Sequence, residues 1–284
     1  LGIEVAKYYE AEIISADSRQ VYRGMDIGTG KITKKEMKGV PHHLLDVASP
    51  RQKFDVARYK TLADKSIHRI LAKNKIPIIC GGTGFYIQAI VDNISFPDVK
   101  PNEALRKKMA KYSLERLLKI LSKLDPEKSQ TIDAKNKRRI IRAIEITKAL
   151  GKMPALKPNP KYDTLQIGIT KNREDLQKLI EKRLLKRLDQ GMVNEVKKLH
   201  KNGVSWKRLG ELGLEYRFIA LYLQKKITKQ EMIDQLRIAI GQYAKRQITW
   251  FKRDGSIIWL PPENTADKNL MDAKKIIEKF LKNQ

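Results

Sequence analysis

The sequence has little cysteine, few acidic residues for its size and no long apolar run. Cys80 is the single cysteine among 284 residues, so the chain forms neither an internal disulfide framework nor a cysteine-based zinc site. His42 and His43 are adjacent, and sequence neighbours rarely aim both rings at one metal ion, so we expect no metal ligands. No run approaches the roughly 18 apolar residues of a membrane span. We therefore expect no membrane partner, no secretory signal and a cytoplasmic location.

The charge of the chain is strongly positive. Lysine and arginine number 59 against 32 aspartate and glutamate, which gives a formal net charge of +27. A field of this sign attracts polyanions, so nucleic acid is the first expected partner. A solvated, lysine-rich surface without a specific partner is the alternative.

Helical and strand-like segments alternate along the first hundred residues, which predicts a parallel sheet flanked by helices. Strands are expected at 12–16, 76–80, 164–170 and 256–260, helices at 1–9, 55–73, 84–92, 172–189, 192–201, 212–224, 228–252 and from 266 onward, and a charged helical region at 102–153. The proline-rich run MPALKPNPKYD (153–163) reads as an extended linker. We expect an α/β core over 1–191, a mostly helical insertion over 192–240 and a return to the core over 241–284.

The stretch EIISADSRQVYRGMDIGTGK (12–31) places a carboxylate directly after an apolar strand. Open α/β sheets bind ligands outside the carboxyl ends of their strands, so Asp17 is a candidate for chemistry. An Asp-Ser pair after a strand is also typical of a turn or a helix N-cap.

A glycine-rich turn, CGGTG, follows the apolar run IPIIC and precedes a helix. Gly81, Gly82 and Gly84 allow backbone N–H groups to approach an anion at a helix N-terminus, and Thr83 adds a hydroxyl. Glycine also serves any tight strand-to-helix turn. If the two strands are neighbours, Asp17 and Thr83 lie side by side.

Basic segments with interleaved apolar residues form a third pattern. RIAIGQYAKRQITWFKR (237–253) combines Tyr243, Trp250 and Phe251 with five cations, which suits RNA phosphates and bases. Some of these rings, Tyr243 among them, also have the helical spacing of core residues. NKRRIIRAIEI (136–146) and EKRLLKRLDQG (181–191) offer further arginines, Arg183 and Arg187 in the second, which either bind phosphate or are solvated.

These motifs together resemble the tRNA dimethylallyltransferase (tRNA isopentenyltransferase) family. ISADSRQVYRGMDIGTGK, GVPHHLLD, PIICGGTGFYIQAI, RRIIRAIEI and QYAKRQITWFKR occur in the order and approximate spacing of that family, over about residues 1–260. The resemblance implies a P-loop-type α/β fold and transfer of the dimethylallyl group from dimethylallyl diphosphate to N6 of the adenosine 3′ of the anticodon. Mg²⁺ is the implied cofactor, and the tRNA anticodon stem-loop is the implied partner of a monomer.

The resemblance also implies roles for individual residues. Asp17 is expected to be the general base and Thr83 to support the departing oxygen, and diphosphate is expected to contact Gly82, Thr83 and Arg183. The implied tRNA contacts are Asp17, Ser18, Arg19, Gln20, Arg106, Arg138, Arg139, Arg142, Tyr216, Arg217, Lys245, Arg246, Gln247, Thr249, Trp250 and Lys252. Arg19 and Glu215 stand where other members often carry different residues.

One departure concerns the phosphate loop. The family opens with a strand and a GPTASGK[ST]-type loop, an ATP- and nucleotide-binding motif, and this sequence contains no G-x-x-x-x-G-K-[ST]. We therefore expect a sequence truncated at its N-terminus and an impaired activity for this chain alone. The alternatives are an adenylate isopentenyltransferase acting on free nucleotide, a small-molecule kinase and an inactive RNA-binding fragment.

Overall fold

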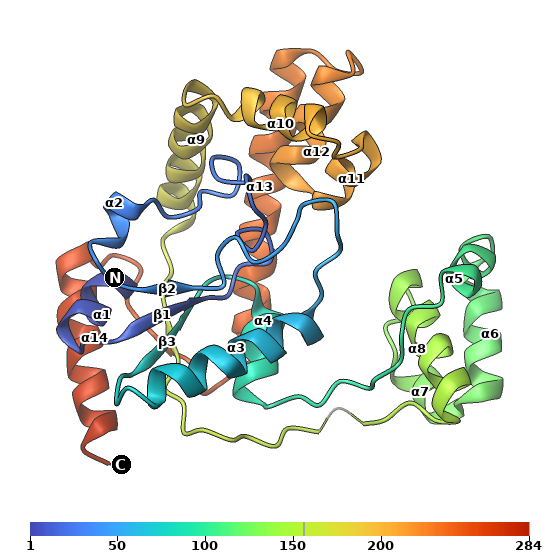
Figure 1. The fold of residues 1–284 in the computed structure, drawn as a ribbon, viewed down its shortest axis with the longest axis horizontal. Helices are drawn as coiled ribbons and strands as arrows, with labels where there is room; N and C mark the ends of the chain where they lie inside the picture. The colour runs from blue at the N-terminus through green and yellow to red at the C-terminus, as the bar shows by residue number, and fades with distance from the viewer. Residues whose placement is uncertain (156, 284) are drawn as a thin grey trace. The chain divides into compact units, whose positions relative to one another are not determined.

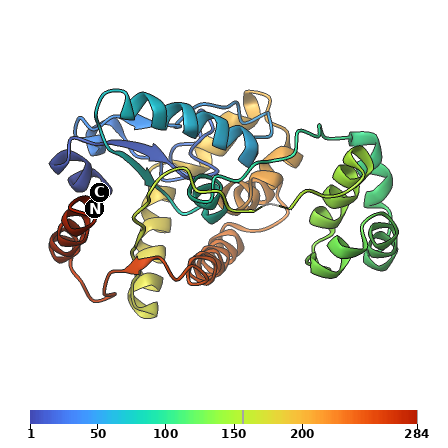
Figure 2. The same cartoon turned by 90° about the horizontal axis from the view of Figure 1, so that it is seen from below.

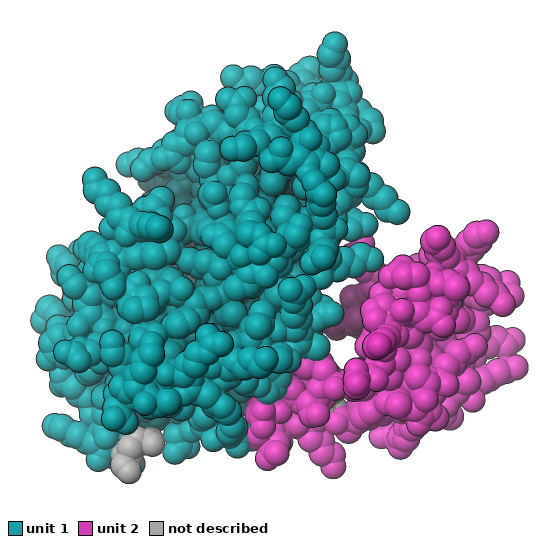
Figure 3. All heavy atoms as spheres, in the orientation of Figure 1, with its two compact units in different colours: residues 1–91, 160–284 teal, residues 92–159 magenta. Residues whose placement is uncertain are grey.

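The computed structural model describes residues 1–155 and 157–283, and the chain divides into two compact units (Figures 1 and 3). Unit 1 contains residues 1–91 and 160–284, and unit 2 contains residues 92–159. No helix of the described ranges is long and apolar enough to cross a membrane.

Unit 1 has a parallel three-stranded sheet with the order β2-β1-β3. Its strands are β1 (Glu12–Ser15), β2 (His42–His43) and β3 (Pro77–Cys80), and a second, two-stranded parallel sheet pairs β4 (Ile167–Gly168) with β5 (Ile258–Trp259). Its helices are α1 (Gly2–Tyr8), α2 (Lys34–Met37), α3 (Val56–Leu71), α4 (Gly84–Val91), α9 (Arg173–Asp189), α10 (Met192–Lys201), α11 (Trp206–Leu212), α12 (Leu214–Leu223), α13 (Lys229–Phe251) and α14 (Ala266–Leu281). The expected α/β class with a parallel sheet and flanking helices is confirmed.

Strand β1 lies in the centre of the sheet and is buried on both faces. Ile13 packs in a small cluster with Ala6 of α1, whereas Ile14 belongs to the large core of unit 1. Successive strand residues point to opposite faces, so a continuous apolar run is what a parallel strand covered on both sides requires. Helices α1 and α3 both pack against β1 and β3 (Figures 1 and 2).

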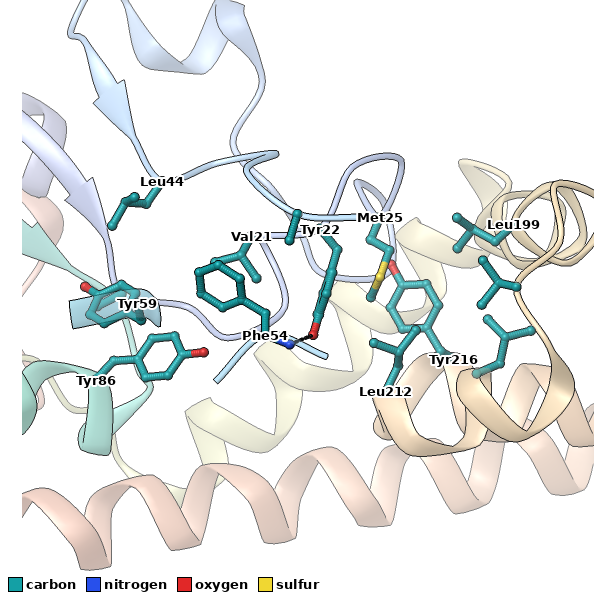
Figure 4. Close-up of a cluster of buried hydrophobic side chains, with 14 of the residues drawn as sticks. Val21, Tyr22, Met25, Leu44, Phe54, Tyr59, Tyr86, Leu199, Leu212 and Tyr216 are labelled. Atoms are coloured by element: carbon teal, nitrogen blue, oxygen red, sulfur yellow. Dashed lines mark hydrogen bonds between the residues drawn. The ribbon is translucent and has the colours of Figure 1, made fainter. Parts of the chain in front are cut away.

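The large core continues from the sheet into the helices after α9. Figure 4 shows Tyr22, Phe54 and Tyr216 among its side chains, and the Phe54 N–H donates a 3.1 Å hydrogen bond to the Tyr22 hydroxyl. Met192, Val196 and Leu209 are fully buried in the same cluster as Ile14, and they lie on helices α10 and α11. Residues 192–240, which were expected to form the insertion, therefore belong to unit 1.

Unit 2 is the separate helical unit of the chain. Its helices are α5 (Glu103–Ala110), α6 (Leu114–Leu124), α7 (Pro126–Thr131) and α8 (Lys137–Leu150), and they enclose their own core around Leu117, Leu121 and Ile140. The expected helical region at 102–153 is confirmed. The apolar side chains of its helices pack against one another in a core of their own. The expected linker at 153–163 has no helix or strand among its described residues; Leu156 lies outside them.

Candidate active site

The site forms at the carboxyl ends of β1 and β3. Ser15 pairs with Cys80 in the last register position, and beyond it the Ala16 N–H donates to the Cys80 carbonyl at 2.8 Å. The Thr83 N–H then donates to the Ala16 carbonyl at 3.0 Å. The ladder thus continues past both strands and brings residues 17 and 83 together.

Asp17 occupies a tight turn directly after β1. Its Oδ1 accepts hydrogen bonds from the backbone N–H groups of Arg19, at 2.7 Å, and Gln20, at 3.2 Å. These bonds fix the carboxylate and leave Oδ2 without a hydrogen-bond partner among residues 1–155 and 157–283. The turn expected for an Asp-Ser pair is therefore present, and it lies at the carboxyl end of β1.

Thr83 is linked directly to this turn. The backbone N–H of Ser18 donates a 3.0 Å hydrogen bond to Thr83 Oγ1. Thr83 also opens helix α4, because its carbonyl accepts from the N–H groups of Tyr86 and Ile87. The expectation that Asp17 and Thr83 lie side by side is confirmed.

The glycines of the CGGTG turn have packing roles that the sequence did not indicate. A Cβ at Gly81 would collide with the backbone of Ala16, so glycine is required for the two strand ends to approach. A Cβ at Gly82 would meet Gln247, whose Nε2 donates to the Gly82 carbonyl at 2.8 Å. A Cβ at Gly84 would likewise collide with the ring of Trp250, which packs directly over this glycine.

The loop from Asp26 to Gly30 is held by one carboxylate. Glu195 of α10 accepts hydrogen bonds from the N–H groups of Asp26, Ile27 and Gly28, at 2.8, 2.7 and 3.1 Å, and from the Tyr216 hydroxyl at 2.7 Å. Charge-assisted bonds of this kind are stronger than those between neutral groups. The sequence around Glu195 does not predict that its carboxylate holds this loop, because the four groups that donate hydrogen bonds to it lie far from Glu195 in the sequence.

Charged side chains of α9 and α12 are coupled electrostatically to Asp17. Arg187 pairs with Glu215 at 3.5 Å, and both side chains are largely buried. Burial raises the pKa of Glu215, and the Asp17 charge adds to this rise. Burial and the neighbouring charge of Arg183 lower the pKa of Arg187. Arg183 itself is exposed and is open to a bound anion.

Asp17, Ser18 and Arg19, three of the residues expected to contact tRNA, lie half-buried in the turn after β1, and the other thirteen fall into two groups. The exposed group keeps its side chains accessible and comprises Arg138, Arg139, Arg217, Lys245, Arg246, Thr249 and Lys252. The second group is engaged inside the protein and comprises Arg106, Arg142, Tyr216, Gln20, Gln247 and Trp250.

Three members of the second group differ most from the expectation. Tyr216 is 1% exposed, with its hydroxyl on Glu195, so its side chain does not reach a surface ligand. Arg106 and Arg142 of unit 2 both hold the buried carboxylate of Glu145, and Arg142 also donates to the Val99 carbonyl at 2.9 Å. Their guanidinium groups satisfy a buried charge, which explains arginine at these positions without RNA.

A protein-built metal site is not found in the described ranges. They contain no group of three or more His, Cys, Asp or Glu side chains placed to hold an ion. Mg²⁺ commonly takes only one or two carboxylates and completes its shell with substrate phosphates and water. The residues of the described ranges alone therefore do not form a Mg²⁺ cage.

The fold and this site define an α/β protein with a cluster of polar residues at the carboxyl edge of a parallel sheet. The IPP transferase family matches residues 20–254. A tRNA dimethylallyltransferase 1 of Syntrophus aciditrophicus is 40% identical over 92% of this chain and 88% of its own length. The tRNA dimethylallyltransferase 2 of Shewanella sediminis is 43% identical, over 92% and 88%. The chain belongs to the IPP transferase family.

Solved structures agree with this assignment. The full-length tRNA isopentenylpyrophosphate transferase of Bacillus halodurans superposes with a TM-score of 0.76 at 35% identity, covering 99% of this chain and 91% of that one. A eukaryotic dimethylallyltransferase acting on tRNA superposes with a TM-score of 0.85 at 25% identity, covering 100% and 76%.

Proposed function

We propose that this protein transfers the dimethylallyl group of dimethylallyl diphosphate to N6 of the adenosine 3′ of the anticodon in tRNA, with release of diphosphate. The relatives named above are tRNA dimethylallyltransferases, and the family is shared over most of the chain. The observation that carries the proposal is the hydrogen-bonded junction that brings Asp17 and Thr83 together. A carboxylate can take the proton of a nucleophile, and a neighbouring hydroxyl can donate to the oxygen of the leaving group, so the two together support a transfer reaction.

Asp17 acts as the general base. The adenine N6 attacks the allylic carbon, the carbon–oxygen bond to diphosphate breaks, and one N6 proton passes to Asp17 Oδ2. The backbone N–H groups of Arg19 and Gln20 occupy Oδ1, which aims the remaining oxygen at the reacting amine. Such positioned bases contribute on the order of 10²–10⁴-fold to rate.

Thr83 and nearby cations receive the leaving diphosphate. The Thr83 hydroxyl donates to the oxygen that takes the electron pair, and the exposed Arg183 and the Gly82 N–H contact the phosphate oxygens. The Thr83 N–H takes no part, because it donates to the Ala16 carbonyl. When bound to diphosphate, Mg²⁺ supplies positive charge for the phosphate oxygens. The Arg187 charge is already paired with Glu215, so we assign the diphosphate contact to Arg183.

The tRNA anticodon stem-loop is the proposed macromolecular substrate, and the chain acts on it as a monomer in the cytoplasm, where tRNA is modified. The net charge of +27 supplies attraction for the phosphate backbone. The exposed Lys245, Arg246 and Lys252 supply phosphate contacts in unit 1, and Arg138 and Arg139 supply them in unit 2. The target base leaves its stack at a cost of a few kcal/mol, which these contacts offset.

The proposal is tested with radiolabelled dimethylallyl diphosphate and unmodified tRNA. We expect label on tRNA, none on adenosine monophosphate, and none on a tRNA with guanosine in place of the target adenosine. Asp17→Asn should lower the transfer rate by about 10²-fold or more, with tRNA affinity within several-fold of the unsubstituted chain. Transfer to free nucleotide alone, or an unchanged rate for Asp17→Asn, would contradict the proposal.

A further inference from the structure

Gln20 connects the Asp17 carboxylate to the end of the loop from Asp26 to Gly30. Its backbone N–H donates to Asp17 Oδ1 at 3.2 Å, and its side-chain Nε2 donates to the carbonyls of Thr29 and Gly30, at 3.5 and 3.4 Å. One residue therefore binds both the carboxylate and the loop. Any displacement of Gly30 is passed to Gln20 and to the N–H group that fixes Oδ1.

Arg187 of α9 packs directly on Gly30. A Cβ at position 30 would collide with the guanidinium group, so this group fills the space that a side chain would take. Gly30 has a φ of +59°, a conformation that glycine adopts without strain. Any larger residue at position 30 would displace Arg187, so the two residues are fitted to each other.

Glu215 of α12 in turn holds the guanidinium group of Arg187. Its Oε1 lies 3.5 Å from Arg187 Nη1, and the Arg187 and Glu215 side chains are only 17% and 12% exposed. The charge of Asp17 acts on both groups, which agrees with a place beside the candidate active site. A buried ion pair adds little net stability, since desolvation of the two charges offsets their attraction. Stability alone therefore does not account for the pair, whereas its contact with Gly30 gives it a role in positioning.

We propose that Arg187 and Glu215 are positioning residues for Asp17. They hold Gly30, and through Gly30 and Gln20 they keep Oδ2 of the carboxylate directed at the reacting amine. This inference rests on the proposed function. Neither Arg187 nor Glu215 touches the substrate, because both act through the backbone of the loop and of the turn.

A purely structural ion pair makes a different prediction from a positioning pair. Removing one charge leaves the other buried and unpaired, so Arg187→Gln and Glu215→Gln should each lower stability. Replacing both residues leaves no unpaired charge and should restore stability. If the pair serves only stability, the double variant also regains the full rate. If the pair positions Asp17, the rate stays low, because glutamine is shorter than arginine and does not cover Gly30.

The test compares Arg187→Gln, Glu215→Gln and the double variant in the full chain. The midpoint of urea denaturation should fall in each single variant and return to the unsubstituted value in the double variant. We expect kcat of the double variant to stay about 10-fold low, less than the roughly 10²-fold cost of a 1 Å misplacement, with the KM values for tRNA and dimethylallyl diphosphate within twofold. A double variant with restored stability and full rate would overturn the positioning role.

Two further variants make the comparison specific. Arg187→Lys keeps a cation beside Glu215, and therefore the fold, but lacks the planar fork that lies on Gly30. It should lower kcat severalfold with an unchanged denaturation midpoint, and a full rate would count against positioning. Glu4→Gln combined with Lys38→Gln neutralises an exposed ion pair of unit 1. This matched control should leave both the midpoint and kcat unchanged.

A second readout keeps this inference separate from the proposed function. The backbone N–H groups of Arg19 and Gln20 bond to Asp17, so their hydrogen exchange reports on the turn without any turnover. In the double variant these two amides should exchange severalfold faster, whereas the amide of Ile14 in β1 should not change. Unchanged exchange of both amides would overturn the link between the ion pair and the turn. Faster exchange in a chain that transfers nothing to tRNA would refute the proposed function and leave that link standing.

Discussion

The backbone N–H of Ser18 donates a 3.0 Å hydrogen bond to Thr83 Oγ1, and it joins two turns that lie 65 residues apart in the sequence. The bond exists because β1 and β3 are neighbours and because Gly81 lets their ends approach. The geometry of the site therefore depends on backbone packing as much as on the reactive side chains.

Gly81→Ala should disrupt this junction. The added Cβ collides with the backbone of Ala16, which is fixed in the sheet and cannot move aside as a flexible side chain does. We expect a loss of about 1–3 kcal/mol or more in the free energy of unfolding and a loss of transfer activity. Urea denaturation followed by tryptophan fluorescence measures the change.

Gly241→Ala is the matched control for that substitution. Gly241 lies inside α13, and a Cβ there meets nothing within 4 Å. Alanine is the better helix former, so the variant should gain about 0.5–1 kcal/mol. Equal effects of the two alanines would show that close approach at Gly81 is unimportant.

Glu145→Gln should destabilise unit 2. Burial raises the pKa of Glu145, but hydrogen bonds from Arg106, the Asn102 N–H and Arg142 outweigh burial and hold the pKa below its usual range. Removing the charge leaves two arginines without their partner, at a cost of about 3 kcal/mol. Hydrogen exchange of residues 103–150 in the full chain reports the loss, with the exposed Glu115→Gln as control.

The same carboxylate predicts a pH dependence of unit 2. Because the folded pKa of Glu145 is depressed, its stabilisation is complete above the unfolded value and is lost as pH falls through the folded value. Exchange protection, corrected for the intrinsic rate, should decline in acid for the unsubstituted chain and less steeply for Glu145→Gln. Parallel acid profiles for both chains would contradict this account.

Glu195→Gln should release the loop from Asp26 to Gly28. The carboxylate accepts four hydrogen bonds, two on each oxygen. In glutamine an NH₂ group, which cannot accept a hydrogen bond, replaces one of these oxygens, so two of the four bonds are lost. We expect a loss of about 2–3 kcal/mol and faster exchange of these three amides. Tyr216→Phe removes only one donor and should cost about 1 kcal/mol; the exposed Glu174→Gln should have no effect.

The two faces of α13 should separate tRNA binding from catalysis. Arg246 is exposed, so Arg246→Ala should weaken tRNA binding and reduce the salt slope by about 1. Gln247 holds the Gly82 carbonyl, so Gln247→Ala should lower the rate and leave the salt slope unchanged. Filter binding over a salt series, together with transfer assays, measures both, and identical slopes for the two variants would count against this division.

The sequence predicted the parts of the fold that depend on local pattern. The apolar run before Asp17 and the glycines after Cys80 identified both strand ends, and the structure places Asp17 and Thr83 together as expected. The two-residue strand His42–His43 was missed, because a strand that short has no detectable alternation.

The sequence did not predict which polar residues are used inside the protein. From the sequence, Tyr216 was expected to contact tRNA, but in the structure its hydroxyl is bonded to Glu195. Arg142 was likewise expected to contact tRNA, but in the structure it pairs with the buried carboxylate of Glu145. The insertion was expected at 192–240, yet the apolar faces of those helices fill the core beside Ile14. Each of these contacts depends on the tertiary fold, so the spacing of residues along the sequence does not predict it.

The central place of β1 also governs when the site appears during folding. Ile13 pairs with His42 on one side and with Ile78 on the other, so both ladders close long loops before they yield any hydrogen bond. Contacts of such high sequence separation slow folding and form together with the helices that cross over the sheet. The chain thus gains the juxtaposition of Asp17 and Thr83 only once β1 has paired with β3, so the site forms late, together with the sheet.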